Sequence, residues 1–266
     1  MKKLVLLIGC VLGVALAAAA ADSELDARWD NANLSYINAD YTAAAAAYED
    51  IAREGCVSSR LFYNLGNAYF KSGNIARAIL NYHKTIALSP FDRDARYNLA
   101  IANTFVKDRI DVVPEFFLSA WLRSLRAVFN ANGWAVVSLV LLAVSLAAFL
   151  VFVVVDPKAW RKCGFWTGIV CFVLFVCAVV FAAVDRHAML HPSQAVVMQQ
   201  AVAVKSSPDT AGSDLFVLHE GTCVKVVSSY GSWTEIMIPD GNKGWLNSDA
   251  IELIDPYAGS SHTQLH

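Results

Sequence analysis

The sequence predicts a multidomain membrane protein in which an all-α region of repeats, two transmembrane helices and a small all-β barrel follow one another. Three observations predict this architecture. The stretches 134–155 and 165–184 contain no charged side chain, and a helical motif recurs at a 34-residue period within residues 25–107. Short β-rich runs separated by turn residues fill the region 194–255. The chain is 56% hydrophobic with a mean hydropathy of +0.44, as expected for a protein with a large membrane-embedded part.

Residues 1–21 have the pattern of a secretory signal peptide, because a basic start and an apolar run precede small residues. Cleavage after Ala20 or Ala21 satisfies the small-x-small rule. A lipoprotein signal ending at Cys10 is an alternative, although it leaves only a short apolar run before the cysteine. Either signal exports the segment that follows. The remaining predicted segments are repeats 22–108 (25–58, 59–92 and a partial 93–108), amphipathic segment 109–133, span 134–155, cytoplasmic loop 156–164, span 165–184, linker 185–193, barrel 194–255 and polar tail 256–266.

The repeats resemble the tetratricopeptide family, in which pairs of helices stack into a solenoid. The residues of the complete repeat that match the family pattern are Leu65, Gly66, Tyr69, Gly73, Ala78, Tyr82 and Pro90. We expect small residues such as Gly66 to let paired helices approach, while Tyr82 fills the space beside them. The first repeat departs from the pattern, since Ala32 replaces the glycine and Cys56 the proline.

Two interpretations of the repeats remain open: a spacer that holds the chain off the membrane, and a groove that binds an extended peptide. In tetratricopeptide proteins the first helix of each repeat lines the concave face. Asparagine side chains there can pair with the backbone of a bound peptide. We expect these side chains to face the open groove, so that replacing Asn64 and Asn98 with alanine should hardly change folding. The candidate groove residues are Asn33, Asn64, Asn67 and Asn98, with Arg60 and Lys71 nearby.

The two apolar stretches are predicted to form a membrane-spanning hairpin. As helices, each reaches the roughly 30 Å of the hydrocarbon core. Three cations in the loop between them favour a cytoplasmic loop, so that both flanks lie in the periplasm and the hairpin in the inner membrane. The small residues Gly164 and Gly168 are a possible helix contact. Before the first span, apolar residues on one face opposite Arg123 and Arg126 predict a helix lying in the outer interface.

The region 194–255 resembles the bacterial SH3 family, and we expect it to fold as a barrel on its own. The residues that carry the resemblance are Val204-Lys205-Ser206-Ser207-Pro208, Leu218, Gly221, Trp233 and Gly244-Trp245-Leu246. In that family, aromatic residues on the barrel face often contact peptides or cell-wall material. The resemblance therefore implies Tyr230, Trp233 and Trp245 as binding candidates, although Trp233 fits a core position better.

Several classes of function find no support in the sequence. The net charge of −2, without a cationic cluster outside the short loop, argues against a nucleic-acid partner. No common catalytic motif occurs, and we predict neither enzymatic activity nor a cofactor. His187 and His191 could hold a metal with Asp185, but interfacial polar residues are the favoured interpretation. Cys56 and Cys223 are interpreted as buried thiols in different domains rather than a disulfide.

The order of these parts resembles the E-protein family of the Bacteroides aerotolerance (Bat) operon over the whole mature chain. That resemblance implies a non-enzymatic inner-membrane adaptor or scaffold. Its partners would be other Bat-operon membrane proteins, some of which have von Willebrand A domains. Its role would be to support tolerance of oxygen or of envelope stress. A protein that binds the cell wall through the barrel, as a sensor or an accessory of a peptidoglycan hydrolase, is the alternative.

Overall fold

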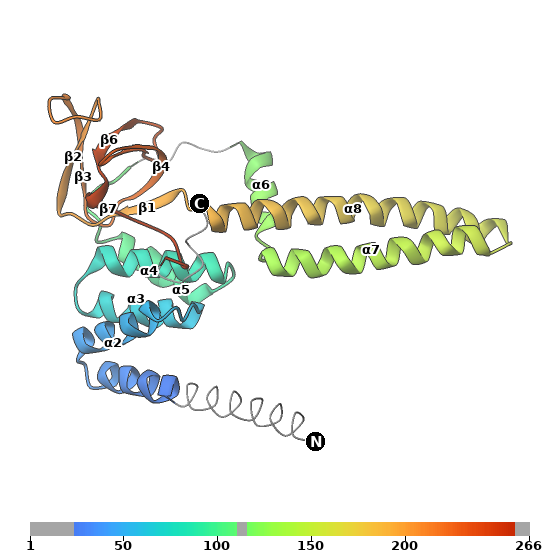
Figure 1. Ribbon diagram of the computed structural model, residues 1–266, viewed down its shortest axis with the longest axis horizontal. Helices are drawn as coiled ribbons and strands as arrows, with labels where there is room; N and C mark the ends of the chain where they lie inside the picture. The colour runs from blue at the N-terminus through green and yellow to red at the C-terminus, as the bar shows by residue number, and fades with distance from the viewer. Residues whose placement is uncertain (1–23, 111–115, 259–266) are drawn as a thin grey trace, which may run out of the picture.

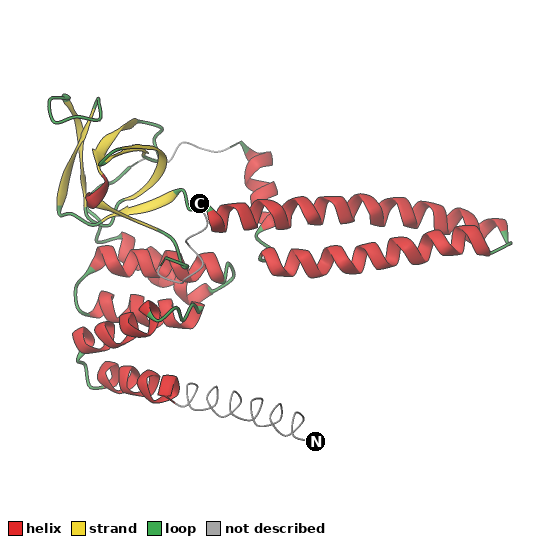
Figure 2. Ribbon diagram, in the orientation of Figure 1, coloured by secondary structure: helices red, strands yellow, loops and turns green. Residues whose placement is uncertain are grey.

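The computed structural model describes residues 24–110 and 116–258, so the predicted signal peptide and most of the polar tail lie outside the described residues. The chain contains a helical array, a pair of long apolar helices and an antiparallel sheet (Figures 1 and 2). The helices are 24–37, α2 (Tyr41–Arg53), α3 (Ser59–Lys71), α4 (Ile75–Leu88), α5 (Arg93–Asn103), α6 (Phe117–Arg126), α7 (Ala131–Val154) and α8 (Lys158–Leu190). The strands are β1 (Gln194–Val197), β2 (Ala201–Lys205), β3 (Asp214–His219), β4 (Cys223–Tyr230), β5 (Trp233–Met237), β6 (Lys243–Asn247) and β7 (Ile251–Leu253).

The helical array consists of neighbouring antiparallel helices joined by short turns. A polar side chain caps the N-terminus of each of α2, α3, α4 and α5 by accepting a hydrogen bond from a backbone amide. The turn before α4 contains Gly73 at a φ of +85°, which suits glycine, whereas the equivalent turn before α2 holds Ala39 at +62°. A Cβ atom on Gly66 would lie 2.7 Å from the ring of Tyr82, so α3 and α4 approach closely there. The predicted small residue and the tyrosine beside it are confirmed as packing partners.

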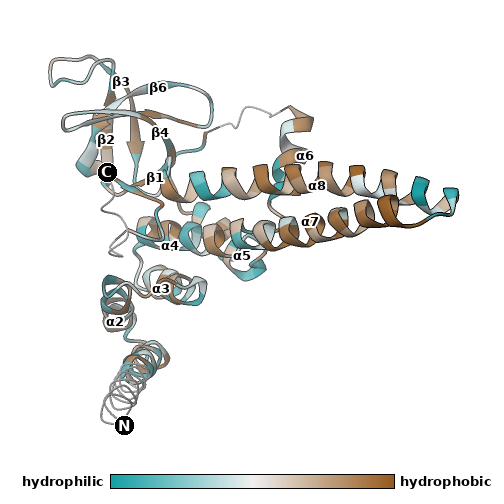
Figure 3. Ribbon diagram, turned by 45° about the vertical axis from the view of Figure 1, so that its right-hand side comes forward, coloured by the Kyte–Doolittle hydropathy of each residue, from teal (hydrophilic) through white to brown (hydrophobic). Residues whose placement is uncertain are grey.

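The helices α7 and α8 pack against each other as a hairpin, and each is long and apolar enough to cross a membrane. Apolar residues cover most of their length, with polar residues gathered at the ends (Figure 3). Gly164 lies at the contact, where a Cβ atom would be 2.8 Å from the carbonyl oxygen of Ala148. The hydroxyl of Ser145 donates a hydrogen bond to the carbonyl of Gly168 at 3.0 Å. The pair of small residues is therefore used within the hairpin.

Both ends of α8 extend beyond the predicted span. The helix begins at Lys158 and ends at Leu190, so parts of the predicted loop 156–164 and linker 185–193 are helical. Pro157 precedes the first turn with a φ of −62°, which already suits a helix start. The tight reversal is thus limited to residues 155–157.

The seven strands form one antiparallel sheet in the order β3-β2-β6-β5-β4-β1-β7. Its own core contains Val197, Val204, Ile236 and Leu246, all fully buried. Val196, on the other face of β1, and Ile254 belong instead to the core of the helical array. The sheet therefore packs against α4 through β1, and it covers apolar surface of the helical array there.

Candidate partner-binding surfaces

The predicted groove asparagines lie half-buried between helices, where their side chains form hydrogen bonds with tyrosines. The hydroxyl of Tyr48 donates to the Asn33 side-chain oxygen at 2.7 Å. One 34-residue period later, Tyr82 donates to Asn67 at 2.8 Å, and the Asn98 amide donates to the same Asn67 oxygen at 2.9 Å. This arrangement joins the two helices of one hairpin to the first helix of the next.

Asn64 and Tyr48 lie one 34-residue period before Asn98 and Tyr82, so the two pairs occupy equivalent positions in the array. Burial raises the pKa of Tyr48, and a hydrogen bond from the Asn64 side chain partly opposes that effect. Burial likewise raises the pKa of Tyr82, against a smaller opposing effect of Asn98. Because each asparagine has a partner inside the array, its side chain contributes to helix packing, and peptide binding stays a prediction.

The two cations predicted beside the groove are on its exposed surface. The guanidinium of Arg60 lies 5.2 Å from the ring centroid of Trp29, so it bridges the first helix and α3 by a cation–π contact. Lys71 is exposed in the last turn of α3. Of the six candidates, Lys71 is therefore the one whose replacement disturbs packing least.

The three aromatic candidates of the sheet lie outside its core. Tyr230 and Trp233 pair across the turn between β4 and β5, and Tyr230 is 69% exposed. Trp245, on β6, is opposite Glu235 on the neighbouring strand. Trp233 and Trp245 are half-buried and alternate with buried residues along β5 and β6, so both point away from the core. The prediction that Trp233 belongs to the core of the sheet is therefore wrong.

A polar junction that the sequence did not predict ties the helical array to the sheet. The Asp108 carboxylate, just after α5, accepts hydrogen bonds from the His219 amide at 2.7 Å, the His219 ring at 2.6 Å and the Thr222 hydroxyl at 2.7 Å. Burial acts to raise the pKa of Asp108, but these hydrogen bonds prevail and hold it below its ordinary value. The other ring nitrogen of His219 lies 2.9 Å from the Lys107 ammonium. A neutral ring that donates through Nδ1 and accepts through Nε2 satisfies both contacts.

Glycine completes this junction. Gly221 has a φ of +85°, and a Cβ atom there would lie 2.9 Å from Val106 and 3.1 Å from Ile79. Only glycine allows the turn before β4 to approach the array so closely. Gly221 was part of the SH3-like pattern, but its contact with the helices could not be read from that pattern.

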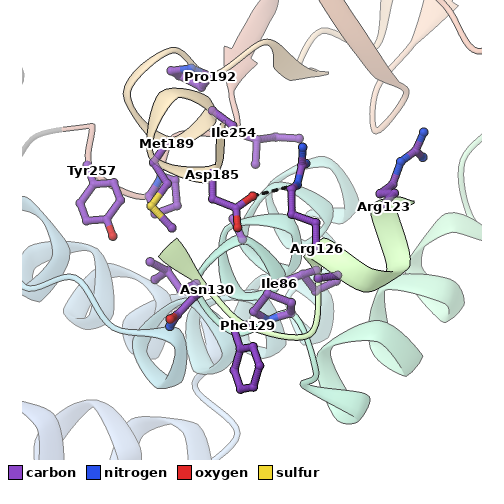
Figure 4. Close-up of a pocket in the computed structure, with 16 residues that line it drawn as sticks. Ile86, Arg123, Arg126, Phe129, Asn130, Asp185, Met189, Pro192, Ile254 and Tyr257 are labelled. Atoms are coloured by element: carbon purple, nitrogen blue, oxygen red, sulfur yellow. Dashed lines mark ion pairs between the residues drawn. The ribbon is translucent and has the colours of Figure 1, made fainter. Parts of the chain in front are cut away.

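A cavity of about 260 Å³ lies where the array, α6, the start of α7, the end of α8 and the segment after β7 meet (Figure 4). Nε of Arg126 lies 2.9 Å from a carboxylate oxygen of Asp185, and the two side chains form an ion pair in the cavity wall. The Trp134 indole donates to the Arg126 carbonyl oxygen at 2.8 Å. The ion pair and the hydrogen bond together hold the end of α6 to both long helices. The sequence placed Arg126 on the polar face of its helix, but not beside Asp185.

The histidines near the end of α8 do not form a metal site with Asp185 in this arrangement. The rings of His187 and His191 stack with their centroids 4.4 Å apart, while Asp185 forms an ion pair with Arg126. Within the described residues, no three or more histidine, cysteine, aspartate or glutamate side chains are placed to hold a metal ion. Cys56 and Cys223 are free thiols, and burial raises the pKa of Cys223 to about 11, which disfavours its reactive thiolate.

Comparison with known proteins adds no assignment to these surfaces. No protein-family model matches this chain, and no curated protein matches it.

Proposed function

We propose that this chain is a membrane-anchored adaptor that presents two binding surfaces on one side of a membrane. One observation carries the proposal: the helical array and the sheet lie together at one end of the α7–α8 hairpin, with the turn at the other end (Figure 1). Both long helices have the length and composition of membrane spans. A hairpin with folded parts at one end only is suited to hold partners at the membrane surface.

The junction at Asp108 supports the adaptor role. Because three hydrogen bonds and shared apolar packing join the array to the sheet, the two parts keep a fixed relative position. Partners bound to the two parts would be held at a defined distance from each other. The groove side would take an extended segment of one partner, and the aromatic face of Trp233 and Trp245 a second ligand.

The finer assignment follows from the resemblances in the sequence. The array would be a short tetratricopeptide solenoid, and the sheet a bacterial SH3 domain. The hairpin would lie in the inner membrane, with both soluble parts in the periplasm. The partners would be other membrane proteins of a Bat-type complex that supports aerotolerance or resistance to envelope stress.

A second candidate function is binding of cell-wall material through the sheet. The observation that favours it is the outward position of Tyr230, Trp233 and Trp245 on neighbouring strands. Aromatic rings on such a surface stack on sugar or peptide groups. Sedimentation of the protein with isolated peptidoglycan, lost on replacement of Trp245 by alanine, would favour this function over the adaptor role.

Topology is tested with fusions to alkaline phosphatase, which is active only outside the cytoplasm. A fusion after Gly259 should be active and one after Lys162 inactive, because the array and sheet share one side. The reverse pattern would contradict the periplasmic assignment. Activity of both fusions would contradict the hairpin in the membrane.

Recruitment is tested by detergent pull-down of the tagged full-length protein. Replacing Asn64 and Asn98 with alanine should weaken recruitment about tenfold or more, since each of the two lost hydrogen bonds is worth about 1 kcal/mol. Both asparagines also contact tyrosines inside the array, so helical content is measured in parallel. Lys71→Ala is the second variant, because its side chain is exposed. If the Asn64/Asn98 double variant and Lys71→Ala each recruit the same partners in the same amounts as the unmodified protein, the array is a spacer.

A further inference from the structure

A row of aromatic side chains crosses the first helices of the array, separate from the asparagines predicted to bind a peptide. Trp29, Tyr63 and Tyr97 lie one 34-residue period apart, in helix 24–37, α3 and α5. Equivalent positions of successive repeats lie on the same face, so the three rings share one surface. The sheet contacts the array chiefly through α4, a second helix, and Tyr97 is 67% exposed. The row therefore lies on a surface that a partner can reach.

Contacts within the array hold two of these rings in place. Trp29 packs edge-on against Tyr48 with ring centroids 5.6 Å apart, and the Tyr63 ring lies 6.3 Å from that of Tyr82. The Asn98 amide donates a hydrogen bond to the Tyr63 hydroxyl oxygen at 3.2 Å. The hydrogen of that hydroxyl can still be donated to a ligand. Because the rings are ordered before a partner arrives, little side-chain entropy is lost on binding.

The spacing of the row favours a polyproline II segment over a β-strand. Neighbouring first helices touch through side chains: Arg60 of α3 lies over the Trp29 ring, and Asn98 of α5 donates to Asn67 of α3 at 2.9 Å. Helices in such contact lie about 8–10 Å apart. A polyproline II helix has three residues per turn and presents the same face about every 9.3 Å, whereas a β-strand does so about every 6.6 Å. Prolines three residues apart can therefore meet successive rings.

The charges beside the row favour a basic residue next to the prolines. One turn before the rings, the same face carries Asp26, Arg60 and Asp94, again one period apart. Arg60 is engaged by the Trp29 ring. Asp26 and Asp94 are exposed, and in the described part of the chain neither forms an ion pair. A carboxylate thus lies beside the ring at each end of the row, and Asp94 can pair with a lysine or arginine of the partner.

We propose that this aromatic row binds a proline-rich segment of a partner protein, in the polyproline II conformation and with a basic residue beside the prolines. The proposal rests on the adaptor role and gives the ligand of the array a chemical class. Prolines at three-residue intervals pack on the three rings, and the Tyr63 hydroxyl donates to a carbonyl oxygen of the segment. The basic residue pairs with Asp94. Seven residues cover the row, because six steps of about 3.1 Å reach about 19 Å.

The test measures binding of a fluorescent peptide to the full-length protein in neutral detergent, by fluorescence anisotropy. The peptide has three prolines at three-residue intervals followed by an arginine, and a second peptide has alanine in place of each proline. The proline peptide should bind about tenfold more tightly. Tyr97→Ala should weaken its binding about tenfold. Asp94→Asn should weaken it about threefold, and should have no effect when glutamine replaces the arginine of the peptide.

Phe91→Ala is the matched control, since Phe91 is 62% exposed just before α5 and does not belong to the row. Circular dichroism checks that each variant keeps its helical content. The proposal is overturned if Tyr97→Ala binds the proline peptide normally, if Phe91→Ala weakens binding as much, or if the two peptides bind equally or not at all.

The detergent pull-down separates this proposal from the adaptor role. A full-length protein that recruits no membrane protein contradicts the adaptor role itself. Recruitment of the same partners in the same amounts by the unmodified protein and by Tyr97→Ala contradicts only the aromatic row.

Discussion

The Asp108 carboxylate accepts hydrogen bonds from both the backbone amide and the ring of His219, although 111 residues separate the two in the chain. One oxygen takes the ring nitrogen, and the other takes the amide together with the Thr222 hydroxyl. A side chain of the helical array thereby organises the turn before β4. The sheet and the array behave as one folded unit at this point.

Replacing Asp108 with asparagine should destabilise the protein by about 2 kcal/mol at pH 7, because hydrogen bonds to a charged, largely buried acceptor are lost or reversed. The folded-state pKa of Asp108 is below its ordinary value of about 3.9. The charged carboxylate therefore makes its full contribution to the free energy of unfolding at pH values above that ordinary value. It is lost as the pH falls through the folded-state pKa. Thermal unfolding of both proteins between pH 3 and pH 7 checks this. The exposed Asp26→Asn is the control, and a difference that does not shrink in acid would contradict the prediction.

Ala39→Gly should stabilise the protein by about 0.5–1 kcal/mol. Ala39 holds a φ of +62°, a region that costs a residue with a Cβ atom about 1–2 kcal/mol, and part of the relief is offset by the greater freedom of unfolded glycine. The reverse change at the equivalent turn, Gly73→Ala, should destabilise by a similar amount. No heavy atom lies within 4 Å of a Cβ at Gly73, so backbone strain alone is tested there. Chemical denaturation of both variants measures the two changes in the free energy of unfolding. Changes of the same sign would contradict this explanation.

Asn67→Ala should lower stability by about 1–3 kcal/mol, because it leaves the hydroxyl of Tyr82 without its acceptor in a position that is 1% exposed. Tyr82→Phe removes the donor instead. The double variant should be less destabilised than the sum of the two single variants, with a coupling of about 1 kcal/mol. Denaturant titration of the four proteins measures this coupling, and strict additivity would show that the hydrogen bond contributes nothing.

Gly164→Ala should weaken the α7–α8 hairpin, whereas Gly168→Ala should leave it unchanged or slightly more stable. A Cβ at Gly164 would meet backbone atoms of α7 at 2.8 and 3.0 Å, which the helices can relieve only by moving apart. At Gly168 the nearest atom would be 3.7 Å away, an ordinary contact. Thermal unfolding in detergent should show a loss of about 1–3 kcal/mol for the first variant alone. Equal behaviour of the two would mean that this contact does not set the helix separation.

The isolated fragment 194–258 should keep a β signal in circular dichroism but unfold at a lower temperature than the sheet in the full chain. Its own core persists, since Ile236 and Leu246 are buried within the sheet. Val196 and Ile254 lose the helices that cover them, at a cost of about 1.5–3 kcal/mol each. Unfolding of the fragment at the same temperature would show that the array gives the sheet no support.

Local sequence patterns predicted the parts of this fold that depend on local spacing. Gly66 and Tyr82 recur in a known pattern, and their close approach is what the pattern requires. Local spacing does not locate strand β3, because its exposed and buried residues do not alternate regularly from Asp214 to His219. The ends of α8 were also missed, since charged residues outside the apolar run were interpreted as loop although they continue the helix.

The candidate surfaces were predictable only in part, because a local pattern places a residue on a face but does not name its distant partner. A residue's position within a repeat identifies the face it belongs to, and so placed the asparagines along one series of helices. It does not identify a partner far away in the chain. Neither Asp108 with His219 nor Arg126 with Asp185 has a spacing that any repeat or motif encodes. Such contacts depend on how whole elements dock.

The short turn between α7 and α8 limits what the chain can sense. Helix α7 ends at Val154 and α8 begins at Lys158, so the far end of the hairpin offers little more than the cations of the first turns of α8. In the proposed orientation, no folded domain within residues 24–110 and 116–258 faces the cytoplasm. For this part of the chain, a message from inside the cell would arrive through a neighbouring protein, by contact with those cations or with the lipid-facing sides of the two helices.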